Sequence, residues 1–190
     1  MNNFKTIVII ASCIFILLFS SLFCFKESIL MAQMLDSVKF EEPGYGYSIK
    51  YPSDWIYEKK GNATIIFSGL KGTDSYFSTV NVQKLFSNKF EEGSYDSVMS
   101  VINDLKNQLI NGAVDTKIFD EKDYNYSDSI KGREFTTEYS RYDEKFKQWV
   151  VVVPGKNNDF YFLWSYTCPI HLYNEYYMTA KAMLKSWKLD

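Results

Sequence analysis

An uncharged apolar run at residues 7–25 constrains this chain more than any other feature. Thirteen of its nineteen residues are Ile, Val, Leu or Phe. As a helix rising about 1.5 Å per residue, the run spans about 29 Å, close to the thickness of the hydrocarbon core of a bilayer. Its apolar side chains would contribute at most about −4 to −8 kcal/mol to membrane insertion. The sequence therefore predicts one transmembrane helix within residues 1–25.

Three interpretations of this segment compete. A cleaved secretory signal has a shorter apolar core, followed by a cleavage site with two small residues. Leu22-Phe23-Cys24 does not provide such a pair of small residues, and the weak candidate site Leu30-Met31-Ala32 lies far downstream. Lipoprotein processing at Cys13 would cleave the chain in the middle of the run and would leave the apolar residues 14–25 in the mature protein. We therefore favour an uncleaved signal-anchor that holds the protein to the membrane through residues 7–25. Cleavage or lipidation of the signal stays open.

The basic residues around the run predict its orientation. Lys5 precedes the run and favours a cytoplasmic N-terminus, while Lys26 follows it directly and weakens that bias. The sequence thus predicts a single-pass protein of the cell membrane whose domain faces outside the cytoplasm. The alternative orientation stays open.

The rest of the chain divides into a juxtamembrane stalk at 26–42, which could continue the anchor helix, and one folded domain at 43–190. Beyond residue 25 there are 20 basic and 23 acidic residues, a net charge near −3. Nucleic-acid binding requires clustered Lys and Arg, so this mild acidic balance indicates no nucleic-acid partner. A segment of this length normally folds as a single domain.

Short strands and two helices are expected within the domain. Alternation and turn residues predict strands over 45–51, 55–60, 63–67, 77–85, 117–119, 133–142, 146–153 and 160–167. The spacing of Val98, Val101, Ile102, Leu105 and Leu109 predicts a helix with Ser94 as its N-cap. Pro169 fits the first turn of a closing helix. This order predicts an α+β fold in which helices flank an antiparallel sheet.

Few residues suggest chemistry. Cys168 is the only cysteine of the domain and His171 the only histidine, so an internal disulfide and a structural zinc site are excluded. A nucleophilic Cys168 paired with His171 is the sharpest enzyme hypothesis, and a buried thiol is the simpler interpretation. Asp120-Glu121-Lys122-Asp123 is expected to be a solvated loop rather than a calcium site. We expect no catalytic, cofactor-binding or metal-binding residues.

The segment Tyr45-Gly46-Tyr47-Ser48-Ile49-Lys50-Tyr51-Pro52-Ser53-Asp54-Trp55 resembles the opening strand and turn of PsbP-like domains. The order of elements and the ending Met183-Leu184-Lys185-Ser186-Trp187-Lys188-Leu189 are similar to that family as well. The resemblance covers residues 39–190 and implies an α/β/α-type sandwich that docks to other components. The apolar N-terminus makes this chain similar to PsbP-related proteins outside photosynthesis.

The leading functional hypothesis is a membrane-anchored, extracytoplasmic binding or assembly module without catalytic activity, with a protein partner at the cell envelope. The alternatives are a cell-surface hydrolase with an unrecognised site, or a small-ligand or glycan receptor. Asn62 and Asn125 match the glycosylation pattern, and Lys181, Lys185 and Lys188 could face either solvent or anionic lipid. Partner identity, oligomeric state and modification of the two asparagines stay open.

Overall fold

A computed structural model describes residues 36–61, 63–91 and 93–190. The transmembrane helix expected at 7–25, the first ten residues of the stalk and Asn62 lie outside these residues. Within the described ranges, no helix is both long and apolar enough to cross a bilayer.

The described residues form ten strands, two α-helices and two short 3₁₀ helices. The strands are β1 (Ser37–Glu41), β2 (Tyr47–Pro52), β3 (Trp55–Lys60), β4 (Thr64–Gly69), β5 (Thr79–Phe86), β6 (Val114–Asn125), β7 (Lys131–Arg141), β8 (Glu144–Pro154), β9 (Phe160–Pro169) and β10 (Lys188–Leu189). The helices are η1 (Asp74–Phe77), α2 (Val98–Gly112), η2 (Lys156–Asn158) and α3 (Tyr173–Ser186).

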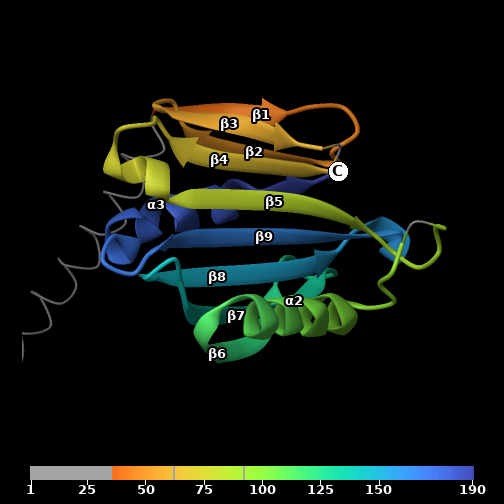
Figure 1. Ribbon diagram of the computed structural model, residues 1–190. Coiled ribbons are helices and arrows are strands. Elements are labelled where there is room, and N and C mark those ends of the chain that lie inside the picture. The colour runs from red at the N-terminus through yellow and green to blue at the C-terminus, as the bar shows by residue number, and fades with distance from the viewer. Residues whose placement is uncertain (1–35, 62, 92) are drawn as a thin grey trace, which may run out of the picture.

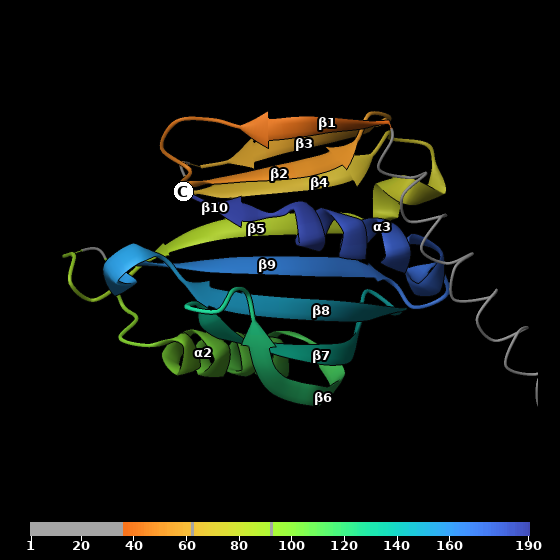
Figure 2. The ribbon, with the colours of Figure 1, turned by 180° about the vertical axis from the view of Figure 1, so that it is seen from behind.

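Two antiparallel sheets organise the fold. The large sheet has the order β3-β4-β5-β9-β8-β7-β6, and the small one has the order β1-β2-β10. Helix α2 crosses the face of the large sheet that is nearer the viewer in Figure 1. Helix α3 lies across β5 and β9 on the opposite face, which is turned forward in Figure 2. The expected α+β sandwich with helices on both faces of an antiparallel sheet is confirmed.

The larger hydrophobic core lies between α3, the small sheet and the large sheet. Tyr47, Ile49 and Tyr51 share one face of β2, as alternation predicts, and each is at most 8% exposed. Trp55 follows the Pro52 turn and is 5% exposed. The PsbP-like opening segment therefore delivers its aromatic side chains to the interior.

A second core lies under α2, and β8 separates the two. Val151 and Val153 belong to the core beside α3, whereas Val150 and Val152 belong to the core beside α2. All four valines are at most 2% exposed. The continuous apolar run of β8 was expected to be covered on both faces, and this is confirmed.

Several expected boundaries are wrong. Ser37–Glu41 form strand β1 rather than a helical stalk, because Phe40 packs at 2% exposure against the rings of Tyr45 and Phe67. The N-cap of α2 is Ser97 rather than Ser94: its hydroxyl accepts a hydrogen bond from the Ser100 amide in a capping box.

Pro169 also differs from the expectation, since it ends β9 and the closing helix begins only at Tyr173. The acidic run 120–123 is part of a strand rather than a loop. It lies in β6, which pairs with β7 despite two irregularities of register.

Candidate functional site

One part of the large sheet carries no helix on the side of α3. There β6, β7 and the first half of β8 extend beyond α3, and Figure 2 shows no described helix in front of them. Side chains alternate along β7, so Phe135 and Thr137 point to the buried side under α2 and are 0% exposed. Glu134, Thr136 and Glu138 occupy the other side. We call the surface formed here by β6, β7, β8 and the start of α3 the polar face.

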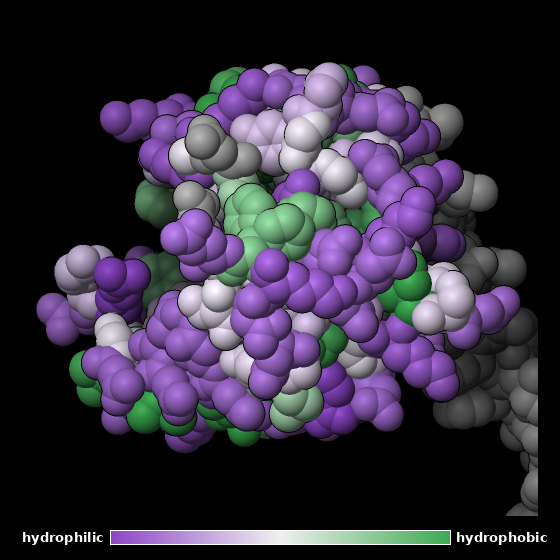
Figure 3. Space-filling model, turned by 90° about the vertical axis from the view of Figure 1, so that its right-hand side faces the viewer, coloured by the Kyte–Doolittle hydropathy of each residue, from purple (hydrophilic) through white to green (hydrophobic). Residues whose placement is uncertain are grey.

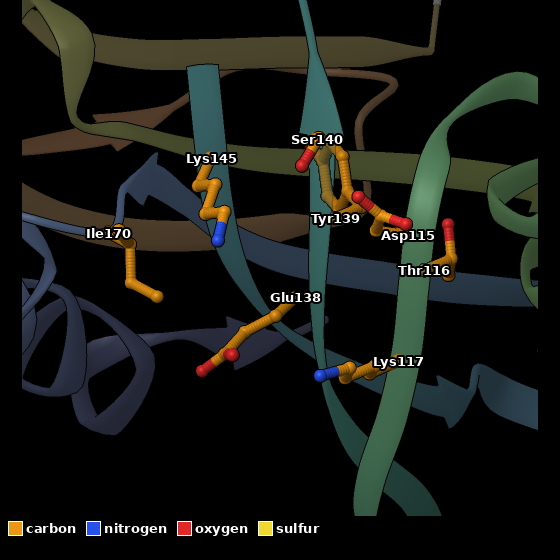
Figure 4. Close-up of a pocket in the computed structure, with 8 residues that line it drawn as sticks. All are labelled: Asp115, Thr116, Lys117, Glu138, Tyr139, Ser140, Lys145 and Ile170. Atoms are coloured by element: carbon orange, nitrogen blue, oxygen red, sulfur yellow. The ribbon is translucent and has the colours of Figure 1, made fainter. Parts of the chain in front are cut away.

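The polar face contains two hollows. The first has a volume of about 270 Å³ and is lined by Asp115, Thr116, Lys117, Glu138, Tyr139, Ser140, Lys145 and Ile170. In Figure 4 the Glu138 carboxylate lies below the amino group of Lys145 and to the left of that of Lys117. The second hollow has a volume of about 170 Å³ and is lined by Asp120, Lys122, Glu134, Thr136, Trp149, Tyr173 and Tyr177.

Cross-strand pairs hold the polar side chains in place. Lys122 of β6 lies 3.3 Å from a carboxylate oxygen of Glu134 on β7, and the Glu134 side chain is only 12% exposed. The indole N–H of Trp149 on β8 donates to the other oxygen of the same carboxylate at 2.8 Å. Because two donors from both neighbouring strands share this carboxylate, its position is well determined.

Lys147 links the hollows. Its Nζ lies 3.2 Å from a carboxylate oxygen of Glu138, which lines the first hollow. The same Nζ lies 5.3 Å from the ring centre of Tyr173, which lines the second, and 5.1 Å from that of Phe119. At these distances the rings attract the cation through their electron-rich faces.

Aromatic rings form one wall of the second hollow. The ring of Trp149 lies 5.7 Å from that of Tyr177, which lies 5.9 Å from that of Tyr173. Behind them Trp149 also contacts the fully buried Trp164 at 5.2 Å, so the wall is anchored in the core. Burial raises the pKa of Tyr173 and of Tyr177, which keeps both phenols neutral at physiological pH.

The charges of the polar face balance. Four lysines (117, 122, 145 and 147) meet four carboxylates (Asp115, Asp120, Glu134 and Glu138). A surface of this kind suits a partner that itself carries both signs of charge, because a polyanion would meet the carboxylates. Within the described residues, no group of three or more His, Cys, Asp or Glu side chains could hold a metal ion.

Of the residues singled out in the sequence, Asp120 and Lys122 line the second hollow, whereas Cys168 and His171 line neither hollow. Cys168 is 0% exposed, and burial raises the pKa of its thiol, so the reactive thiolate is disfavoured. His171 is exposed three residues later. The placement of Cys168 supports the interpretation as a core residue and does not fit a nucleophile.

The acidic run has structural partners. Glu121 pairs with Lys106 of α2 and, at 2.9 Å, with Arg133 of β7, and Asp123 pairs with Arg133 at 2.7 Å. These bonds hold β6 to its neighbours.

The other surface residues noted in the sequence are exposed: Lys181, Lys185, Lys188 and Asn125. None of them lines either hollow of the polar face.

The polar face was not foreseen. The alternation of Glu134, Thr136, Glu138 and Ser140 along β7 is the signal that could have indicated it, because it places polar side chains on one side of a strand whose other side is buried. No pattern in the sequence indicates that Tyr173 and Tyr177 belong to this face, since their position depends on where α3 packs.

No protein-family model matches the chain, and no curated protein matches it in sequence. Solved structures do resemble it. Cyanobacterial PsbP (CyanoP) from Synechocystis sp. PCC 6803 aligns with a TM-score of 0.54 and 11% identity over 82% of this chain and 93% of that chain. The Ran-binding protein Mog1p of Saccharomyces cerevisiae aligns with a TM-score of 0.54 and 10% identity over 80% and 95% of the two chains.

LpqN of Mycobacterium tuberculosis, described as involved in cell envelope biogenesis, aligns with a TM-score of 0.53 and 13% identity over 80% of this chain and 91% of that chain. A longer structure from Bacteroides thetaiotaomicron is matched over only 49% of its length, with a TM-score of 0.53 and 14% identity. At these identities the likeness concerns the fold alone. The chain therefore has a PsbP-like fold, in agreement with the resemblance of residues 39–190.

Proposed function

We propose that this protein is a single-pass, membrane-anchored module whose domain lies outside the cytoplasm and binds a protein partner through the polar face, without catalysing a reaction. The apolar run at 7–25 supports the anchor. Two proteins of similar fold are described as Ran-binding and as involved in cell envelope biogenesis. Those descriptions fit a module that works by binding.

The observation that carries the proposal is the polar face itself. It joins Trp149, Tyr173 and Tyr177 to a set of balanced charges. Tyr and Trp are enriched at protein–protein interfaces and supply a large share of their binding energy. Because Glu134 already bonds to Trp149 and Lys122, the surface is organised before a partner arrives, which lowers the entropic cost of binding.

Crosslinking in intact membranes tests the proposal. A photoreactive residue replaces Lys122, whose side chain is 67% exposed on the polar face, or Met99, which is 40% exposed on α2 as the matched control. We expect a discrete protein adduct from position 122 only. The charge reversal Lys145→Glu, at an exposed position of the first hollow, should weaken that adduct.

Equal adducts at both positions, or none at 122, would contradict the use of the polar face. The rival classes give different results. A hydrolase would show turnover in a substrate screen that Glu138→Gln or Glu134→Gln abolishes. A glycan or small-ligand receptor would show a thermal shift with the isolated ligand and no protein adduct.

A further inference from the structure

The connections at one end of the fold lie together because the strand registers place them there. Ser37 pairs with Pro52, Trp55 with Gly69, Thr79 with Thr167, Phe146 with Pro169, and Val114 with Ser140. The connections β2–β3, β4–β5, α2–β6, β7–β8 and β9–α3, with the residues that flank them, therefore form one end, at the left in Figure 1. We call it the proximal end.

The described chain begins at this end. The carbonyl of Asp36 accepts a hydrogen bond at 3.1 Å from the amide of Ser53, which lies in the β2–β3 connection. Ten residues separate Asp36 from the apolar run 7–25, and ten residues reach at most about 35 Å even when fully extended. If the run is embedded in a bilayer, the proximal end is the part of the domain held nearest to the lipid.

Exposed apolar side chains gather at the same end. Of the thirteen large hydrophobic side chains that are exposed in the described chain, six lie there: Leu70, Tyr76, Phe77, Val114, Tyr142 and Ile170. The most exposed are Tyr142 at 87%, Val114 at 66% and Phe77 at 55%. These residues come from four separate connections, so the exposed apolar side chains are spread over the end rather than confined to one loop.

The opposite end provides a contrast. Its exposed Phe86 and Phe90 pack against each other at 5.7 Å and against Phe160 at 5.3 and 5.4 Å, and Lys84 covers Phe160 at 4.0 Å. Figure 3 looks onto that end and shows a small hydrophobic area within a mostly hydrophilic surface. Tyr76 and Phe77 at the proximal end also contact each other, at 5.6 Å, so the two ends differ in exposure: Phe77 and Tyr142 are 55% and 87% exposed, against 38% and 40% for Phe86 and Phe90.

We propose that the proximal end rests in the interface of the bilayer, with Phe77, Tyr142 and their apolar neighbours among the lipid headgroups. This inference rests on the proposed anchor. Aromatic residues, Tyr among them, prefer the membrane–water interface, where the ring is sheltered and the hydroxyl is hydrated. The guanidinium of Arg141 lies 5.2 Å from the ring centre of Tyr142 and would meet the headgroup phosphates.

The charges at the proximal end determine the kind of contact. The acidic residues at this end outnumber the basic ones: Asp36, Asp54, Asp74, Asp115, Asp143 and Glu144 against Lys71, Arg141 and Lys145, with His171 not counted. Anionic lipid would therefore repel this end on balance. The contact should be apolar, and neutral phosphatidylcholine should support it fully.

The test uses the full chain in phosphatidylcholine vesicles. Benzoylphenylalanine replaces Phe77 or Tyr142 at the proximal end, or Phe90 or Met99 as controls; Phe90 and Met99 are each 40% exposed. We expect lipid adducts at 77 and 142 to exceed those at 90 and 99 several-fold by mass spectrometry. Replacing part of the phosphatidylcholine with phosphatidylserine should not increase them.

Equal adduct yields at the two ends, or adducts that require phosphatidylserine, would overturn the inference. Carbonate extraction of the same vesicles separates this failure from failure of the anchor. A chain that resists extraction but shows equal yields refutes only the position of the proximal end. A chain that carbonate releases refutes the anchor and the inference together.

Discussion

The indole N–H of Trp149 donates a hydrogen bond to the carboxylate of Glu134 on the neighbouring strand, at 2.8 Å. The pair joins the aromatic wall of the second hollow to its charged side chains. Since the Glu134 side chain is 12% exposed, solvent screens this bond less than it screens the ion pair of Lys147 with Glu138, whose side chains are 27% and 35% exposed.

Removal of this carboxylate should destabilise the domain. Glu134→Ala leaves the Trp149 N–H and Lys122 without their acceptor, so we expect a loss of about 1.5–3 kcal/mol in the free energy of unfolding by urea denaturation. Glu138→Ala is the control, because its pair with Lys147 is partly solvated and should contribute less than about 1 kcal/mol. Equal losses in the two variants would contradict the special role of Glu134.

Trp55 should be essential for stability. Trp55→Ala removes a large side chain that is 5% exposed, and we expect a loss of about 3–5 kcal/mol, measured by denaturant unfolding. The adjacent Ile56→Ala, at a position that is 45% exposed, serves as the control and should change stability far less. A thermal melt of Trp55→Ala that matches the parent protein would refute the buried placement.

The cap of α2 can be located by comparing two serines. Ser97→Ala removes the hydroxyl that accepts from the Ser100 amide and should cost about 0.5–2 kcal/mol of stability. Ser94→Ala should have little effect, because the N-cap of the helix lies three residues after it. The same denaturation assay decides between them, and a larger loss at Ser94 would place the helix start earlier.

Acid should weaken the attachment of β6. Hydrogen bonds from Lys106 and then Arg133 lower the pKa of Glu121 below its ordinary value of 4.5. Because the folded-state pKa is the lower one, this stabilisation is present above pH 4.5 and is lost as the pH falls below it. We expect Glu121→Gln to flatten the acid side of the curve of unfolding free energy against pH.

Glu91→Gln, at an exposed loop position, is the control and should leave the curve unchanged. An acid limb that is as steep in Glu121→Gln as in the parent protein would show that these bonds do not stabilise the fold.

Much of the fold could be predicted from the sequence because local patterns carry it. The alternation in β2 and the apolar run of β8 report directly which faces are buried, and both predictions are confirmed. The ends of a helix or strand could not be predicted where two neighbouring residues fit the same local signal. Ser94 and Ser97 are equally good caps by residue type, and only the geometry of the helix start selects Ser97.

The candidate site could not be predicted, because it exists only where distant segments meet. Tyr173 and Tyr177 reach the polar face through the packing of α3, and Lys147 reaches Tyr173 from β8. Similarly, Asp120-Glu121-Lys122-Asp123 has the composition of a loop, yet pairing with β7 and the bonds of Glu121 to Lys106 and Arg133 make it a strand.

By itself, the sequence determined the pattern of buried and exposed faces and the type of fold, since these follow from the period of apolar residues along the chain. Tertiary structure decided which faces remain uncovered. α3 spans only part of the sheet, so Glu134, Glu138 and Trp149 line surface hollows instead of a core beneath a helix. The strand registers bring Phe77, Tyr142 and Ile170 to one end, because register is a relation between segments that no single stretch of sequence contains.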